Sequence, residues 1–301
     1  MKRKLDPRIM LMISMAVFGS IGLFVKNIPL PSGEIALWRA VLAAILIGIF
    51  LLITKQKIPF KKIKKEIPLL LASGCAMGIN WIFLFEAYKY TTVSAATLSY
   101  YFAPVIVTLV CPLLFKERMG AKQWICFAMS TVGLVLITGV GDTSGGSNHF
   151  LGILFGLLAA LFYATVILLN KFIKNVDGIH RTFLQFLSAI VTLVPYVCFT
   201  SGIELITLDK KGIICLLIVG LVHTGITYCL YFSSLKELTG QKAAILSYID
   251  PLVAVIVSVF VLGEDMTVLQ IVGGALILGF TLWNEITPRK KVSDQVGPTD
   301  K

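Results

Sequence analysis

One stretch of this sequence occurs twice. Residues 95–104 read AATLSYYFAP, and residues 243–251 read AAILSYIDP. In each copy a glutamate lies thirteen residues after the proline, at Glu117 and at Glu264. With a one-residue gap before the proline, the match extends over 33 positions, of which eleven are identical. Apolar residues match one another by chance, but Ser-Tyr, Pro and Glu-x-Met-x-x-x-Gln at constant spacing do not, so the chain is an internal duplication.

Long apolar runs set the environment in which this duplication folds. The chain is 57% hydrophobic and 14% charged, against roughly 25% charged in soluble domains. A helix needs roughly 17 to 25 apolar residues to cross a bilayer. Because the hydrophobicity lies in continuous runs rather than in alternating strands, we predict an all-α polytopic membrane protein with ten transmembrane helices. The runs are 9–25, 35–53, 67–85, 90–115, 123–141, 150–170, 182–203, 212–235, 239–262 and 266–284.

Basic residues are distributed unevenly between these runs. If the N-terminus is cytoplasmic, 22 Lys and Arg residues lie in cytoplasmic segments and four on the outer side. The positive-inside rule therefore predicts a multi-pass protein of the cell membrane with both termini in the cytoplasm. The net charge of +11 is explained by this topology, so we expect a lipid bilayer around the chain and no nucleic-acid partner.

The two copies of the repeat fall on the fourth and the ninth predicted spans, which cross the membrane in opposite directions. We therefore predict two inverted five-helix repeats, residues 1–139 and 150–287, followed by a disordered cytoplasmic tail at 288–301. Inverted repeats give two nearly equivalent packings, one open to each side of the membrane. This property favours a transporter that works by alternating access.

The sequence resembles a known family of membrane proteins. The ten spans, the duplicated helix with a proline and a terminal glutamate, and the pair Trp38-Arg39 are similar to the drug/metabolite transporter superfamily, and more narrowly to its EamA family. The resemblance covers residues 8–287. It implies a carrier of small organic solutes, with amino-acid and metabolite exporters among the members, and a cavity between the first, third, fourth, sixth, eighth and ninth spans. Since small four-helix relatives dimerise to form the equivalent unit, it also implies a functional monomer.

Asp250 lies about halfway along the ninth predicted span. An intramembrane charge is costly and should face a cavity or a partner, and Pro251 frees a backbone carbonyl one turn earlier. Asp250 could bind a proton or a substrate ammonium, or it could be a structural hydrogen-bonding group. His223 has a matching depth in the eighth span and could relay a proton to Asp250, although a neutral interhelical hydrogen bond is the favoured interpretation.

Tyr100 and Tyr248 are the duplicated aromatic residues beside the prolines. The repeat places them at related positions near the middle of the membrane. With Tyr163, Ser99 and Ser247 they are predicted to line the cavity, and core packing explains them equally well.

A second polar group lies in the third predicted span. Glu86 is near its outer end, with Asn80 and Trp81 one to two turns deeper. These side chains could contact a zwitterionic or amphiphilic substrate, while solvation at the interface is the alternative for Glu86. Arg39 is close to the outer interface, and we expect it to brace the second helix rather than to capture an anion.

The duplicated helices end on glutamates. Glu117 and Glu264 would oppose the negative end of the helix dipole, so each requires a hydrogen bond or an ion pair. We interpret both glutamates, with Pro104 and Pro251, as structural or gating elements.

Several function classes have no support in the sequence. The six cysteines all fall in predicted spans without paired spacing, so neither a metal nor a disulfide is expected. Nucleophile-elbow, metalloprotease and Walker motifs are absent, so we expect neither an enzyme nor a cofactor. We predict export of an amino acid or a related small-molecule metabolite. The alternatives are a proton-coupled importer or a multidrug efflux carrier that uses Asp250.

Overall fold

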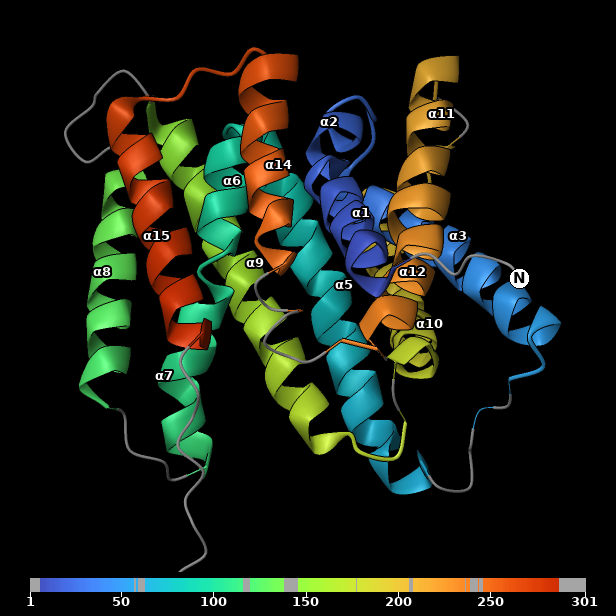
Figure 1. Cartoon of the computed structure of the whole chain (residues 1–301). Coiled ribbons are helices and arrows are strands. Elements are labelled where there is room, and N and C mark those ends of the chain that lie inside the picture. Colours follow the sequence, from blue (N-terminus) through green and yellow to red (C-terminus); the bar gives the residue numbers. More distant parts are fainter. Residues whose placement is uncertain are drawn as a thin grey trace, which may run out of the picture.

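The computed structural model describes residues 6–56, 58, 63–115, 120–137, 146–176, 178–205, 208–235, 237–238, 243 and 246–286. Every regular element within these ranges is helical, as predicted (Figure 1). The longer elements are α1 (Pro7–Gly19), α3 (Ser32–Ile53), α5 (Ile67–Tyr90), α7 (Ala103–Phe115), α8 (Ala121–Ile137), α9 (Gly146–Phe172), α10 (Gly178–Thr200) and α15 (Val268–Ile286). The shorter ones are α2 (Ile21–Val25), η1 (Lys64–Glu66), α6 (Val93–Tyr100), α11 (Lys210–Leu217), η4 (Ile218–Ile226), α12 (Thr227–Leu235), α14 (Ile249–Ile256) and η5 (Val257–Val261).

Seven helical segments among the described residues are long and apolar enough to span a membrane. Three further apolar helices are shorter. The prediction of a polytopic helical protein is therefore confirmed, while ten crossings in two inverted repeats remain a prediction. The seven are Pro7–Val25, Ser32–Ile53, Lys64–Tyr90, Val93–Val110, Asn148–Phe172, Gly178–Thr200 and Lys210–Leu235, and the three are Ala121–Ile137, Ile249–Val261 and Val268–Asn284.

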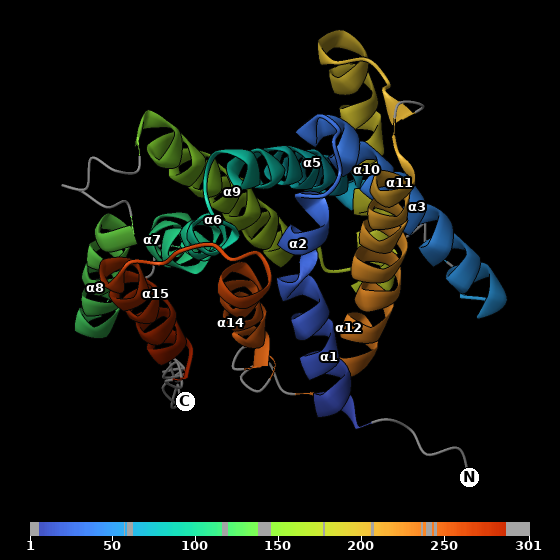
Figure 2. The same ribbon diagram turned by 90° about the horizontal axis from the view of Figure 1, so that it is seen from above.

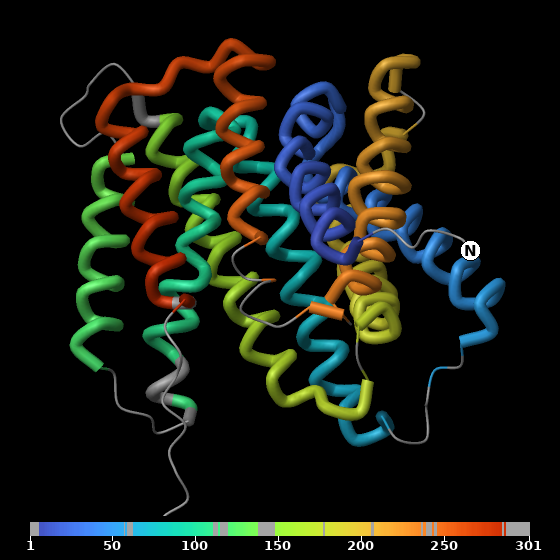
Figure 3. The backbone as a smooth tube through the Cα atoms, in the orientation of Figure 1, coloured from blue at the N-terminus to red at the C-terminus, as the bar shows by residue number. Residues whose placement is uncertain are grey.

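Several spans are interrupted, and the sequence explains the interruptions at the two duplicated prolines. Pro104 is the second residue of α7 and Pro251 the third of α14. A proline has no N–H, and the first turn of a helix has no intrahelical acceptor for one. Each proline therefore begins a new helical segment, after a turn at Tyr101 in one copy and at Tyr248 in the other. Figure 3 traces the backbone through both interruptions.

The segments η4 and η5 are π-helical. In η4 the side chain of Thr224 follows this wider register, since its hydroxyl donates to the carbonyl of Val219, five residues earlier, at 2.8 Å. Single π-helical turns inside longer helices are often found at functional sites.

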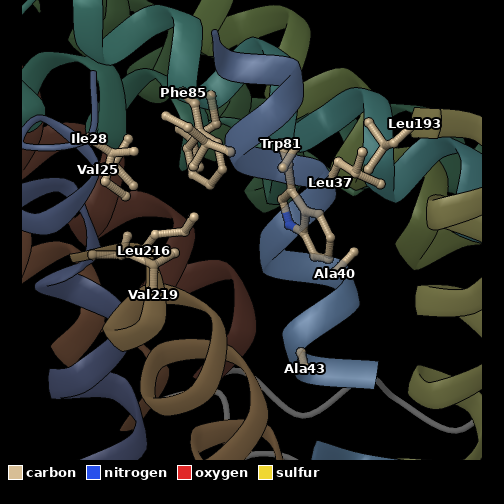
Figure 4. Packing of buried hydrophobic residues seen from close by; sticks show 14 of the residues in the cluster. Val25, Ile28, Leu37, Ala40, Ala43, Trp81, Phe85, Leu193, Leu216 and Val219 are labelled. Atoms are coloured by element: carbon tan, nitrogen blue, oxygen red, sulfur yellow. The ribbon is translucent and has the colours of Figure 1, made fainter. Parts of the chain in front are cut away.

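The helices form two rows that face each other. Seen from above, α5, α6 and α9 lie along one side of the bundle and α1, α12 and α14 along the other, with α8 and α15 side by side at one end (Figure 2). The largest buried cluster lies between α3, α5 and α10 and includes Trp81, Phe85 and Leu193 (Figure 4). The helices α8 and α15 cross backbone to backbone, because a Cβ on Gly133 would lie 2.6 Å from the carbonyl oxygen of Gly273.

Candidate functional site

A cavity of about 330 Å³ lies between the two rows of helices. Its wall is rich in aromatic side chains. Residues of α1, α3, α5, α6, α7, α9, α12 and α14 reach it, so the six spans that the family resemblance implies all contribute, and α3 adds Arg39. The aromatic lining residues are Phe18, Trp81, Tyr88, Tyr100, Tyr101, Tyr163, Tyr228, Tyr231 and Tyr248.

The structure brings many of the predicted site residues together around this cavity. Tyr100 and Tyr163 face each other there, with ring centroids 5.2 Å apart. Aromatic side chains in the wall suit the apolar part of a small organic solute. The predicted residues that line the cavity are Arg39, Trp81, Tyr100, Pro104, Tyr163, Ser247, Tyr248 and Asp250. Pro251 follows Asp250 in α14 and is not among the lining residues.

Asp250 connects the two interrupted helices. Its Oδ2 atom accepts a hydrogen bond of 2.7 Å from the hydroxyl of Tyr101, at the turn between α6 and α7. Sequence reasoning missed Tyr101. A signal was available, because the two copies of the repeat differ at Tyr101 against Ile249 and at Phe102 against Asp250, and the polar residue from each mismatch contacts the other.

Arg39 is buried, with 5% of its surface exposed, and it also lines the cavity. Its Nε atom donates to Thr224 Oγ1 at 2.7 Å. The guanidinium carbon lies 4.4 Å from the ring centroid of Trp81 and 5.5 Å from that of Phe85. These contacts hold α3 against η4 and α5, as expected for a bracing residue, and they leave the guanidinium at the cavity wall.

His223 lies outside the cavity lining. Its Nε2 atom is 3.0 Å from Ser20 Oγ, in the break between α1 and α2, and its ring packs against Phe24. Its Nδ1 atom is 3.3 Å from the carbonyl oxygen of Ile218. Among the described residues, its hydrogen-bond partners therefore do not include Asp250.

Ser99 and Asn80 also point into helix interfaces. The hydroxyl of Ser99 donates to the carbonyl of Ala95 in its own helix at 2.8 Å. The amide of Asn80 donates to the carbonyl of Ala159 in α9 at 2.6 Å, and Asn80 is buried. Asn80 therefore joins α5 to α9, whereas its neighbour Trp81 faces the cavity.

Replacing Asn80 by alanine should lower the stability of the folded protein without changing the cavity. Interhelical hydrogen bonds in membranes contribute about 0.6 to 2 kcal/mol, so we expect a lower thermal unfolding midpoint for Asn80→Ala in detergent. Thr165→Ala is the matched control, since the described hydrogen bond of the Thr165 hydroxyl stays within α9, at 3.0 Å from Leu161 O. A loss of ligand binding at unchanged stability would contradict this assignment and favour a substrate contact.

Glu86 belongs to a separate hollow of about 400 Å³ between the ends of α3, α5, α9 and α10. Its Oε2 atom accepts a hydrogen bond of 2.5 Å from Ser32 and is 3.3 Å from Lys89 Nζ. The predicted cluster of Asn80, Trp81 and Glu86 is therefore not formed. Asn80 bonds to α9, Trp81 lines the cavity, and Glu86 lines the second hollow.

Glu264 joins three elements at one end of the bundle. It forms an ion pair with Lys26 after α2 and accepts a hydrogen bond from Ser258 in η5. Its Oε2 atom also accepts from the backbone N–H of Val93, the first residue of α6, at 2.8 Å. The carboxylate is thereby placed at the positive end of the α6 dipole. Glu117 lies outside the described residues.

Glu34 is a buried acid that sequence reasoning did not single out. Its two oxygens accept from the backbone N–H of Glu204 at 3.0 and 2.9 Å, and Trp38 Nε1 donates to it at 3.1 Å. These bonds fix the loop after α10 to the start of α3. Within the part of the chain that the structure describes, no group of three or more His, Cys, Asp or Glu side chains could hold a metal.

Comparison with known proteins decides the family. The model of the EamA-like transporter family matches residues 8–139 and 150–284. The chain belongs to the EamA-like transporter family. This EamA-like transporter is 33% identical over 277 residues to the uncharacterized transporter YxxF of Bacillus subtilis (strain 168), covering 92% of this chain and 88% of that one.

Other relatives extend this comparison. A protein of Salmonella typhimurium (strain LT2), named a probable amino-acid metabolite efflux pump, is 26% identical over 230 residues, which cover 71% of this EamA-like chain and 76% of that protein. A solved crystal structure shares the fold with a TM-score of 0.64 at 14% identity, over 93% of this chain and 97% of that one. The family that the sequence resembled is therefore confirmed, and the protein is a multi-span membrane transporter.

Proposed function

We propose that this EamA-like transporter exports an amino acid or a closely related metabolite across the cell membrane by alternating access. The observation that carries the proposal is a small, aromatic cavity between the two duplicated and interrupted helices, with Arg39 and Asp250 in its wall. Its volume of about 330 Å³ is near the lower end of the range for ligand pockets, so it favours a small solute. The name of the Salmonella relative supports this substrate class and this direction.

The pattern of helix contacts supports two inverted halves. The pairs of helices that pack together recur when the halves are exchanged. The contact of α5 with α9 corresponds to that of α12 with α1, α5 with α10 to η4 with α3, and α7 with α9 to α14 with α1. This arrangement requires α8, α15 and the segment formed by α14 and η5 to cross the membrane, which gives ten crossings. Both halves are present in one chain, so a monomer suffices.

The distribution of Lys and Arg supports cytoplasmic termini. Reporter fusions test both the cytoplasmic termini and the inverted arrangement of the two halves. A reporter inserted at residue 142, between the halves, should be found outside the cell, and one at the C-terminus inside. If both reporters are on the same side of the membrane, the inverted arrangement is wrong.

Transport itself is tested with the purified full-length protein in liposomes loaded with labelled amino acids. We expect flux of aromatic or large apolar amino acids, with little flux of dianionic sugar phosphates, because one cavity arginine cannot neutralise two negative charges. Absence of flux with a broad panel of amino acids and metabolites would contradict the proposed transport function.

Coupling to protons is a second proposal, favoured by the position of Asp250 in the cavity wall. Asp250→Asn preserves the shape of the side chain but cannot carry a proton, so flux should lose its dependence on an imposed pH gradient. Tyr101→Phe is the matched control, because it removes the hydrogen bond to Asp250 and retains the acid. Equal pH dependence in the wild-type protein and Asp250→Asn would exclude this coupling.

A further inference from the structure

Arg39 forms no ion pair with an acid among the described residues. The described ion pairs are Lys26 with Glu264 and Lys89 with Glu86, and Arg39 belongs to neither. Asp250 lines the same cavity, but its described hydrogen bond is to Tyr101. The cavity therefore holds a buried cation without a direct ion-pair partner in the part of the chain that the structure describes.

Such a charge is costly in a membrane protein. A charged arginine buried within a membrane-spanning helix raises the free energy of insertion. The aromatic faces of Trp81 and Phe85 recover part of this cost through cation–π contacts, and Thr224 satisfies one N–H group. None of these partners is an anion. Bracing alone does not require a permanent charge at this position, since a neutral side chain can pack between the same helices.

The geometry leaves a specific part of the guanidinium available. Nε is used by Thr224, whose own hydroxyl hydrogen goes to Val219 in the π-helical register. This arrangement fixes the plane of the guanidinium. In the described part of the chain the two Nη groups have no protein acceptor, and together they form the planar fork that binds a carboxylate with two parallel hydrogen bonds.

We propose that Arg39 binds the carboxylate of the transported solute, which makes it the specificity residue for a monoanionic carboxylate group. This inference rests on the proposed transport function. The surrounding tyrosines and Trp81 then contact the apolar part of the solute, and Asp250 is available to a cationic group such as an α-ammonium. A single arginine matches one negative charge, which distinguishes a carboxylate from a phosphate dianion.

The test is a double-mutant cycle between protein and ligand. Binding of phenylalanine and of phenylalaninamide, which lacks the carboxylate, is measured with the full-length detergent-solubilised protein by calorimetry and thermal shift. We expect Arg39→Gln to weaken phenylalanine binding by about tenfold to a hundredfold and to leave phenylalaninamide binding unchanged within about twofold. The control is Arg8→Gln, because Arg8 is exposed near the start of α1 and does not line the cavity.

Arg39→Lys keeps the charge but lacks the fork, so it should recover part of the preference for the carboxylate. If Arg39→Gln does not fold, Arg39→Lys is the variant whose binding of the two ligands is compared with the wild-type protein. Equal losses for both ligands would overturn the proposal and assign Arg39 to bracing alone.

If the wild-type protein binds neither amino-acid ligand, the proposed substrate is wrong, and the role of Arg39 is still decided. In that case 3-phenylpropionate is compared with its neutral amide. Binding of the carboxylate alone, and its loss in Arg39→Gln, would support an anion site. No preference between acid and amide in the wild-type protein would overturn it.

Discussion

Replacing Gly19 by alanine should strongly reduce transport. A Cβ at this position would lie 2.3 Å from the carbonyl oxygen of Asp250 and 2.8 Å from Val253 Cβ. The first of these atoms belongs to the backbone, so the clash cannot be relieved by a rotamer change. The α1 helix would have to move away from α14 beside the cavity. Overpacking of this kind costs about 1 to 3 kcal/mol, and we expect flux in liposomes to fall about tenfold or more.

The matched control for this substitution is Gly279→Ala. Gly279 is also helical, but a Cβ there would have no neighbour within 4 Å. Alanine is preferred over glycine in helices, so Gly279→Ala should retain full flux and an equal or higher unfolding temperature. Wild-type flux and stability in Gly19→Ala would show that α1 and α14 do not require this close approach.

Replacing Glu264 by alanine should open one end of the cavity. Glu264 links Lys26, the N-terminus of α6 and η5, and its loss leaves the backbone N–H of Val93 without an acceptor, at a cost of about 1 to 3 kcal/mol. In the proposed orientation this end faces outward. We therefore expect faster modification of a cavity cysteine by a membrane-impermeant thiol reagent added outside. Ser247→Cys, in a background without the native cysteines, provides the reporter.

Two milder variants separate the contributions of Glu264. Glu264→Gln retains an acceptor for Val93 and loses the ion pair, and Lys26→Met removes the same ion pair from the other side. Because Lys26 is partly exposed, the ion pair itself should contribute little. Both variants should therefore label more slowly than Glu264→Ala. If the reporter cysteine is modified at the same rate with and without Glu264→Ala, Glu264 has no role in closing this end of the cavity.

Much of this molecule could be predicted from sequence because the relevant signals are long or repeated. Apolar runs predict membrane helices, and the duplicated Ser-Tyr and Pro residues mark the interrupted helices beside the cavity. The direction in which a side chain points is harder to predict. Asn80 and Trp81 are adjacent, and successive side chains on a helix are about 100° apart, so Trp81 reaches the cavity while Asn80 bonds to α9.

His223 illustrates the same limit. Its predicted depth in the membrane matches that of Asp250. This depth does not determine in which direction around the helix axis the side chain points. The π-helical turn from Ile218 to Ile226 shifts the register further, and it could not be predicted from apolar periodicity. Tyr101 is hard to predict for another reason. The shared residues mark the duplicated helices, whereas Tyr101 lies at a position where the two copies differ.

The hydrogen bond between Tyr101 and Asp250 has a consequence for the energetics of a duplicated carrier. In the proposed alternating-access cycle the two halves exchange shapes, so the pair formed by Tyr101 and Asp250 would take the geometry now held by Ile249 and Phe102, its counterparts in the repeat. A bond between a phenol and an acid cannot be equally strong in two such different geometries. Under the proposed mechanism, the outward-open and inward-open conformers of the empty protein would therefore differ in free energy, and this pair of residues would favour one of them.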